Sequence, residues 1–403
     1  MNQRDMRPPF AALGGTIPPE LEKLPTPCYL LDEAALTRNA EILGGLAQRT
    51  GCKVLLAQKA FSNYDCYPLL APHLAGTEAS GLFEARLGAE EMPGKEVHVF
   101  CAAYRADEMD ELVQYADHIV FNSPAQLAKF GPAAKAAGKS VGLRINPECS
   151  TQDGHAIYDP CAPGSRLGTT RAQWNAAVAA NPALPNLLDG LHFHTLCEQD
   201  SDALATTLDA VAQKFGDLLP RMQWLNFGGG HHITRPGYDI ATLERCITRA
   251  QQDWGVTVYL EPGEACALNA GFLLSRVLDV VQNGDTTIAI LDASAACHMP
   301  DVIEMPYRPP LFAAAEPGEK PCTVCLAGPT CLAGDVIGDY GVDAVPNVGD
   351  LLVFGDMAIY TTCKNNTFNG MPLPAIFARA ASGTTRSIVS FGYEDFKYRL
   401  GKR

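Results

Sequence analysis

Short apolar, β-rich runs recur along the first two thirds of the chain, and their spacing limits the possible folds more than any other feature. The first five begin roughly 21 residues apart, which is the length of a strand, a helix and two short loops. Eight such runs alternating with helix-like stretches predict an α/β protein with a (β/α)8, TIM-type barrel. The runs are Val54–Gln58, Gly76–Ser80, Val97–Cys101, His118–Asn122, Ser140–Asn146, Gly190–Thr195, Met222–Gly228 and Val256–Glu261.

The pattern changes after residue 268, where strand-like runs are separated by turns with little helix. This predicts a second, mainly β domain, and the early run Cys28–Asp32 is expected to join it as a strand. We therefore predict a barrel over residues 32–267 and a β domain built from residues 1–31 and 268–403. The expected strands of that domain are Phe272–Val281, Thr286–Leu291, Pro321–Leu326, Leu351–Phe354 and Ile388–Phe391.

Composition excludes several classes of protein. The first residues lack the apolar stretch of a signal peptide, and no run reaches the about 18 apolar residues of a membrane span. We therefore expect a cytoplasmic protein that does not associate with a membrane. The net charge of −14 argues against nucleic acid, which requires basic patches, and is compatible with a small cationic substrate.

The 14 cysteines are scattered through core-like segments, which predicts reduced thiols rather than a disulfide framework. Cys322, Cys325 and Cys331 form the closest cluster. It lacks a fourth ligand at a normal spacing, so no metal site is predicted there.

Chemistry in such barrels lies where the strands end, which directs attention to Lys59 after the first run. Lysine is rarely fully buried without a partner. Lys59 therefore either marks the exit of the strand to solvent or is a reactive amine that holds a carbonyl cofactor as a Schiff base.

Three further strand ends carry polar groups. His192 and His194 lie at the end of the sixth run and point to the same side of the strand. They are either a metal pair or packing residues, and the lack of a nearby acidic partner motif disfavours the metal. Gly228, Gly229 and Gly230 form either a flexible loop or a set of backbone N–H groups for an oxyanion. Glu261 stands at the end of the eighth run. It is either a functional carboxylate or one that is only solvated.

Together these ends supply an amine, an aromatic ring, a phosphate site and a carboxylate, the parts needed to hold pyridoxal 5'-phosphate. The amine forms the Schiff base and an imidazole stacks on the ring. The glycines take the phosphate, and the carboxylate keeps the pyridine nitrogen protonated. We therefore predict pyridoxal phosphate as the cofactor.

The same motifs resemble the alanine racemase/ornithine decarboxylase-like fold of type III pyridoxal phosphate enzymes, in the right order over nearly the whole chain. Longer strings resemble the carboxynorspermidine decarboxylases within it. These longer strings are His194–Gln199, Leu225–Thr234, Glu261–Ala265 and Lys364–Gly370. The general motifs of the fold are Thr26–Asp32, Ala57–Lys59, His192–His194, Gly228–Gly230 and Glu261–Gly263.

The resemblance implies that Lys59 holds the cofactor, that His194 stacks on its ring and that Tyr360 lies near its phosphate. Glu261 would contact the pyridine nitrogen. A carboxylate there favours an electron-accepting ring and hence decarboxylation, whereas alanine racemases carry an arginine at this place.

The stretch Gly328–Asp335 resembles the cysteine loop of the family, which reaches into the site of the partner subunit in a head-to-tail homodimer. By this resemblance Cys331 would protonate the substrate carbon and Asp335 would help to position the substrate. The alternative for Cys331 is a small buried hydrophobic residue.

Acidic residues replace the arginines of some relatives. Glu264 stands where ornithine-type relatives carry an arginine for the phosphate, so phosphate binding is expected to rest more on the glycines. Asp301 and Glu304 lie where diaminopimelate relatives bind a distal carboxylate through arginine, and they suit a distal amine better, although Arg308 follows them.

The resemblance thus implies a carboxy-lyase of polyamine biosynthesis that converts carboxynorspermidine and/or carboxyspermidine, which are small cationic substrates, to norspermidine and/or spermidine. The alternatives are a decarboxylase of diaminopimelate, ornithine or arginine, and a non-catalytic decarboxylase-like regulator.

Overall fold

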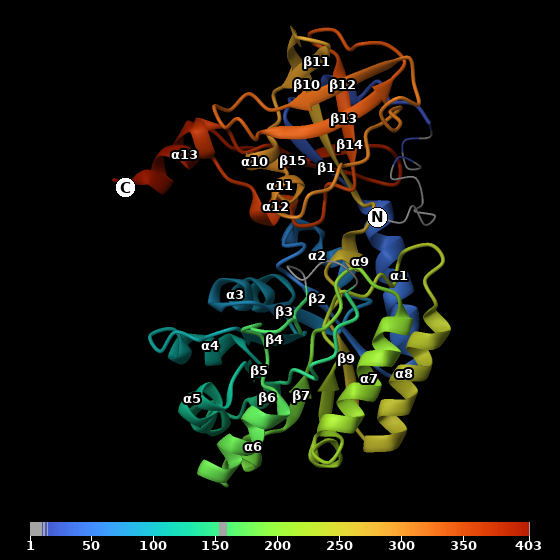
Figure 1. The fold of residues 1–403 in the computed structure, drawn as a ribbon. Helices are drawn as coiled ribbons and strands as arrows, with labels where there is room; N and C mark the ends of the chain where they lie inside the picture. The colour runs from blue at the N-terminus through green and yellow to red at the C-terminus, as the bar shows by residue number, and fades with distance from the viewer. Residues whose placement is uncertain (1–9, 11–12, 14, 153–158, 403) are drawn as a thin grey trace. The chain divides into compact units, whose positions relative to one another are not determined.

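The computed structural model describes Phe10, Leu13, residues 15–152 and residues 159–402 (Figure 1). The chain forms two compact units. The barrel unit comprises Arg38–Lys59 and Cys66–Cys266, and the β unit comprises Met1–Thr37, Ala60–Asp65 and Ala267–Arg403. The short segment Ala60–Asp65 follows Lys59 directly, and its membership of the β unit was not predicted from the sequence.

Eight parallel strands close the barrel in chain order, so the predicted fold of this part is confirmed. Helices lie outside the ring of strands (Figure 1). The strands are β2 Lys53–Ala57, β3 Gly76–Ala79, β4 Glu96–Cys101, β5 His118–Phe121, β6 Ser140–Arg144, β7 Gly190–His192, β8 Trp224–Asn226 and β9 Thr257–Leu260.

Strands β7 and β8 are shorter than the predicted runs Gly190–Thr195 and Met222–Gly228. Gly228 has φ 70°, a left-handed conformation that cannot continue a strand. The chain therefore leaves the ladder early at β8, and its next residues form the loop on which the predicted site depends.

Four helices among the described residues of the barrel unit begin with a side-chain cap. Asp200 accepts a hydrogen bond from the backbone N–H of Ser201 at the start of α7, and Asp239 does so from Thr242 in α8. On α7 the buried positions Leu204, Leu208 and Phe215 form one apolar stripe. The helices are α1 Glu33–Thr50, which begins in the β unit, α2 Tyr67–Leu70, α3 Leu82–Glu91, α4 Met109–Tyr115, α5 Pro124–Ala136, α6 Arg171–Ala180, α7 Ser201–Phe215, α8 Ile240–Trp254 and α9 Glu264–Ala267.

The β unit is an eight-stranded sheet, and the N-terminal strand β1 (Cys28–Asp32) lies inside it, as predicted. Strand β1 pairs antiparallel with β10 and parallel with β15, and all five of its residues are buried. The other strands are β10 Gly271–Asn283, β11 Thr286–Leu291, β12 Cys322–Ala327, β13 Val336–Val342, β14 Leu351–Gly355, β15 Ala375–Arg379 and β16 Thr385–Val389, and the helices are α10 Ala295–His298, α11 Asp301–Glu304, α12 Thr361–Lys364 and α13 Tyr393–Leu400.

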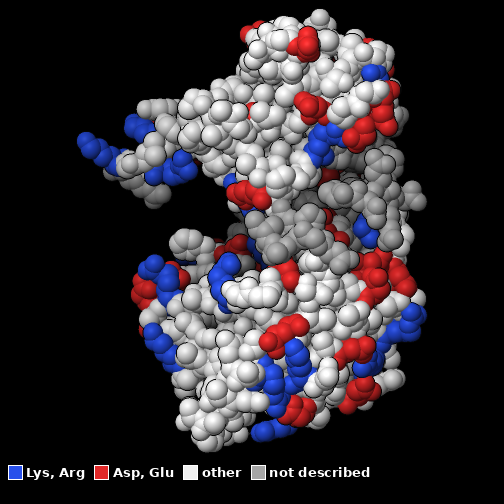
Figure 2. Space-filling view, in the orientation of Figure 1, with Lys and Arg blue, Asp and Glu red and all other residues white. Residues whose placement is uncertain are grey.

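On the face drawn in Figure 2, acidic and basic side chains are interspersed over the barrel unit. No helix in the described part of the chain is long and apolar enough to cross a membrane.

Two glycines inside the barrel make room for one large side chain. A Cβ atom added at Gly190 would lie 2.0 Å from the ring of Trp224, and one added at Gly142 would lie 2.3 Å from the same ring. Trp224 also donates from Nε1 to Ser140 Oγ at 2.9 Å, which fixes the ring in place. Only glycine therefore fits at these two strand positions.

We expect Gly190→Ala to lower the free energy of unfolding by about 1–3 kcal/mol, because an overpacked core must shift its neighbours. Chemical denaturation of the purified variant measures this. Gly81→Ala is the matched control, since nothing lies within 4 Å of its added Cβ. Equal stability of the two variants would contradict the packing argument.

Candidate active site

A buried carboxylate ties together the ends of three neighbouring barrel strands. Glu261 directly follows β9, and its Oε1 accepts a hydrogen bond from Asn226 Nδ2 at 2.6 Å. Its Oε2 lies 3.0 Å from His192 Nε2. Because His192 ends β7 and Asn226 ends β8, three consecutive strands hold one carboxyl group in a fixed orientation.

The surroundings of Glu261 keep it ionised. Burial opposes the charged form, but His192 and the positive charge of Lys59 outweigh burial and lower the pKa of the Glu261 carboxyl. Burial also lowers the pKa of His192. A neutral His192 therefore acts on Glu261 as a hydrogen-bond donor through Nε2.

Lys59 lies in the turn two residues beyond the end of β2 and is half-buried. Its charge lowers the pKa of Glu261 and also acts on Glu78 in β3. Glu78 is buried, and burial together with repulsion from Glu261 raises the pKa of its carboxyl. The amine is thus coupled electrostatically to two acids of unequal strength.

Arg144 supports this group from β6. Its guanidinium lies 4.6 Å from the centre of the Phe100 ring and donates to the His194 carbonyl at 3.0 Å. Phe100 in turn stacks on His192, with the ring centres 5.4 Å apart. Burial lowers the pKa of Arg144 to about 10, so it remains a cation at neutral pH.

The glycine loop packs closely against its neighbours. Gly228 N–H donates to Asn226 Oδ1 at 2.8 Å, and Gly229 N–H donates to His194 Nδ1 at 3.2 Å. The described residues provide no partner for the N–H of Gly230, whose added Cβ would lie 2.0 Å from the Leu196 carbonyl. The predicted anion site therefore offers one open glycine amide, and the other two amides fix the loop and the His194 ring.

Two acids flank a buried histidine beside this loop. His232 Nδ1 lies 3.5 Å from Glu264 Oε1, and His232 Nε2 lies 4.0 Å from Glu198 Oε2. Burial lowers the pKa of His232 to about 4, so the cluster has two carboxylates and a neutral ring at pH 7. Such a cluster can attract a cation.

The predicted acidic residues Asp301 and Glu304 already have a cationic partner. Lys364 Nζ contacts Asp301 Oδ1 and lies 2.7 Å from Glu304 Oε2. The same ammonium lies 5.8 Å from the ring centre of Tyr360. Two carboxylates and one ammonium leave this group with one net negative charge.

Arg308 is also engaged within the β unit. It forms an ion pair with Glu316, donates to the Asp339 carbonyl at 2.8 Å and lies over the Tyr340 ring. Its guanidinium is therefore held by the sheet, as expected for a structural residue.

The cysteine loop has a well-defined internal structure. Cys331 is exposed, and its Sγ donates to Asn369 Oδ1 at 2.8 Å. Asp335 is buried, and Thr330 Oγ1 donates to its Oδ2 at 2.7 Å and Ser294 Oγ to its Oδ1 at 2.9 Å. Asp335 thus holds the loop together.

The sequence analysis did not single out several residues that the structure places in these groups. Glu198, Asn226 and His232 lie inside the strings that carried the resemblance, so a signal for them was present. Glu78 and Arg144 had a weaker signal, a charged residue within an otherwise apolar run.

Comparison with known proteins identifies the family. Residues 28–358 match the family model described as "Pyridoxal-dependent decarboxylase, C-terminal sheet domain". The chain belongs to the pyridoxal-dependent decarboxylases. The expected enzyme class is confirmed, and so is pyridoxal phosphate as the cofactor of the family.

The similarity to individual decarboxylases extends over nearly the full length. A carboxyaminopropylagmatine decarboxylase of Synechocystis sp. is 43% identical over 95% of this chain and 97% of its own. A carboxynorspermidine/carboxyspermidine decarboxylase of Campylobacter jejuni is 40% identical over 94% of this chain and 99% of its own. The crystal structure of carboxynorspermidine decarboxylase complexed with norspermidine from C. jejuni has a TM-score of 0.85 at 39% identity, covering 93% of this chain and 100% of that one.

The residues present fit the cofactor of these decarboxylases. The barrel end offers an amine at Lys59, an ionised carboxylate at Glu261 and an open amide at Gly230. In the described part of the chain, His192 Nδ1 and Glu78 Oε2 are buried polar atoms without a hydrogen-bond partner. Polar atoms in this state are typical of a site that takes up a polar group.

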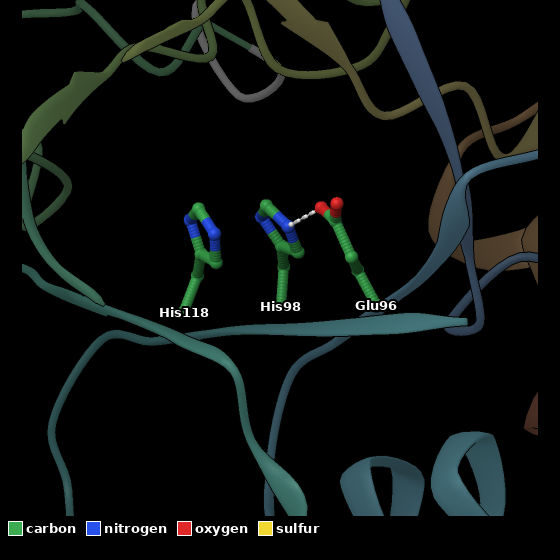
Figure 3. Close-up of side chains that lie close together, drawn as sticks. All are labelled: Glu96, His98 and His118. Atoms are coloured by element: carbon green, nitrogen blue, oxygen red, sulfur yellow. Dashed lines mark hydrogen bonds and ion pairs between the residues drawn. The ribbon is translucent and has the colours of Figure 1, made fainter. Parts of the chain in front are cut away.

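A second histidine cluster lies at the opposite, N-terminal end of the strands of this decarboxylase barrel (Figure 3). His98 Nε2 lies 3.0 Å from Glu96 Oε2, and the rings of His98 and His118 stack with centres 3.9 Å apart and planes 16° apart. The in-plane lone pairs of two nearly parallel rings do not converge on one point, as a tetrahedral metal site requires. Lys53 and Tyr259 also bind Glu96, so we interpret the cluster as a structural ion pair.

This ion pair should make stability depend on pH in acid. Burial would raise the pKa of Glu96, but hydrogen bonds from His98 and Lys53 lower it from 4.5 to about 2. A lowered folded-state pKa stabilises the fold above pH 4.5, and that contribution is lost as the pH falls from 4.5 towards 2. Glu96→Gln should cost about 1–2 kcal/mol at pH 7, and its difference from wild type should shrink across this window in unfolding titrations.

Glu90→Gln is the control, because Glu90 forms an exposed i,i+4 pair with Arg86. It should change the free energy of unfolding by less than about 0.5 kcal/mol. A constant difference between Glu96→Gln and wild type from pH 7 to pH 2 would show that the linkage argument is wrong.

Proposed function

We propose that this enzyme decarboxylates carboxynorspermidine and/or carboxyspermidine to norspermidine and/or spermidine in polyamine biosynthesis. The observation that carries the proposal is the sequence identity of 36–40%, over nearly the whole chain, with two carboxynorspermidine/carboxyspermidine decarboxylases. The carboxylates of Glu198 and Glu264 around His232 in the barrel unit support it, since the substrate is a polycation.

The barrel residues would hold the cofactor. Lys59 would bind it covalently, His194 would lie against its ring, and Gly230 N–H would contact its phosphate, with Tyr360 as a further phosphate contact. When bound, pyridoxal phosphate supplies an electron-accepting ring for the electron pair left by the departing carbon dioxide. Glu261 would keep the proton on the pyridine nitrogen and so favour that chemistry.

Acidic residues would bind the cationic part of the substrate. Glu264, together with Glu198, offers two carboxylates around the neutral His232 ring. Asp301 and Glu304 would attract a second amine through the net negative charge that Lys364 leaves on them. Two separate acidic groups suit a substrate with several spaced amines.

We also propose a cytoplasmic, head-to-tail homodimer in which Cys331 of one protomer serves the barrel site of its partner and protonates the substrate carbon. The exposure of Cys331 within its own chain supports this, because a catalytic proton donor must be enclosed during reaction. Asp335 would position the substrate indirectly, by holding the cysteine loop. The free state of all fourteen cysteines supports a reducing compartment.

A second candidate substrate is carboxyaminopropylagmatine, which ends in a guanidinium group. The observation that favours it is the 43% identity with the Synechocystis enzyme. Either cation suits carboxylates. Diaminopimelate requires a partner for a distal carboxylate, and the engagement of Arg308 with Glu316 disfavours it. Competition assays with all three substrates separate these functions, and a preference for diaminopimelate would refute the polyamine proposal.

We expect the purified enzyme to show a visible absorbance band from the lysine-bound cofactor, and Lys59→Ala to lack that band and lose more than about 1,000-fold in kcat. Visible spectra and assays of the two proteins measure this. Lys95→Ala is the control, since Lys95 contacts the Leu74 carbonyl elsewhere in the barrel unit. The same spectrum in wild type and Lys59→Ala would exclude Lys59 as the attachment point, and a wild type without any band would favour the non-catalytic regulator.

We expect Glu264→Gln to raise the KM for carboxynorspermidine about tenfold, because it removes one carboxylate from the cation-binding group. The cofactor spectrum should stay unchanged. Steady-state kinetics measure the effect. Glu244→Gln is the control, because Glu244 lies on helix α8 and forms an ion pair with Arg49 of α1. An unchanged KM in Glu264→Gln would remove Glu264 from the substrate site.

A further inference from the structure

Two loops of the β unit are joined through one short backbone segment. On one side, Asp335 Oδ1 accepts a hydrogen bond from the Ala296 N–H at 3.1 Å and thereby anchors the cysteine loop. On the other side, Asn366 Nδ2 donates to the Ala296 carbonyl at 2.8 Å, and the Asn366 N–H donates to the Cys297 carbonyl at 3.0 Å. The peptide groups at 296 and 297 therefore hold both loops in register.

Asn369 continues this arrangement to the thiol. Asn366 Oδ1 accepts from the Phe368 N–H at 2.9 Å, which fixes the turn that presents Asn369. Asn369 has φ 60° and ψ 17°, a left-handed conformation that asparagine adopts more readily than most residues, and Gly370 follows with φ 75°. The turn places Asn369 Oδ1 2.8 Å from Cys331 Sγ.

We propose that Asn369 is a positioning residue that fixes the rotamer of Cys331 and the direction of its thiol proton. The inference rests on the proposed role of Cys331 as the proton donor. Within the described residues, Asn369 Oδ1 is the side-chain acceptor that the thiol contacts, whereas Asp335 accepts from Thr330, Ser294 and Ala296. The exposed thiol would otherwise rotate among the staggered positions of χ1.

Directional control matters for the chemistry of this thiol. In the proposed step the S–H bond breaks and a C–H bond forms with the electron pair of the carbon that has lost carbon dioxide. The remaining thiolate regains a proton from water. A thiol held in one direction transfers its proton from the side of the carbon on which the cysteine loop lies. A rotating thiol does so less often, and water then donates a proton to either face.

Asparagine-to-glycine substitution separates the side chain from the backbone, because glycine keeps the left-handed turn and removes the acceptor. We expect Asn369→Gly to lower kcat about tenfold, equivalent to about 1.4 kcal/mol of barrier, with KM within about twofold. Turnover in D2O should place deuterium on one face of the product carbon in the wild type and on both faces in Asn369→Gly. Asn369→Asp keeps an acceptor oxygen and should restore the single face.

Asn269→Gly is the matched control, since Asn269 is also left-handed, with φ 53°, and its backbone N–H donates to Asp356 Oδ1 at 2.7 Å rather than to the cysteine loop. It should keep the wild-type kcat and deuterium placement. Single-face deuterium with unchanged kcat in Asn369→Gly would overturn the inference.

A thiol measurement tests the positioning without turnover. Alkylation of Cys331 by iodoacetamide, followed by peptide mass spectrometry, should be at least about threefold faster in Asn369→Gly than in wild type, because the sulfur loses its contact. In Asn369→Asp and Asn269→Gly it should be no faster than in wild type. An unchanged rate in Asn369→Gly would overturn the inference alone, whereas wild-type turnover by Cys331→Ala would overturn the proton-donor role on which it rests.

Discussion

The site depends on one buried carboxylate that three consecutive strands hold in place. A carboxylate in an apolar interior is stable as an anion only where hydrogen bonds and a positive charge replace its hydration. At Glu261, Asn226 and His192 supply the hydrogen-bond contacts, and Lys59 supplies the charge. Because these groups come from the ends of β2, β7, β8 and β9, closing the barrel and forming the site are one event.

The pKa values of two glutamates at this site shift in opposite directions. Glu261 has hydrogen-bond partners for both oxygens, whereas Glu78 Oε2 has none among the described residues. Burial therefore raises the pKa of Glu78, while contacts lower the pKa of Glu261. Two acids side by side with opposite shifts allow one to remain a fixed negative charge while the other exchanges a proton near neutral pH.

The sequence was sufficient for the parts of the fold and site that follow from local pattern. Regular spacing predicts the barrel, and strand ends lead to Lys59, His194 and Glu261. Strands β13 and β15 were missed: β13 contains two glycines, which weaken its strand pattern, and β15 is stabilised by pairing with the distant strand β1. Contacts across long stretches of sequence were also invisible, such as Lys364 with Asp301 and Glu304, or Asn369 with Cys331. These depend on tertiary structure, which spacing does not encode.

The central place of β1 in its sheet has a consequence for synthesis on the ribosome. The strand leaves the ribosome early, yet its neighbours β10 and β15 begin only at residues 271 and 375. The barrel unit lies almost entirely between them in the chain and contains its own strand pairings, so it can fold while β1 waits. During that interval the five residues of β1, which are buried in the folded protein, are exposed to water, and exposed segments of this kind are prone to aggregate.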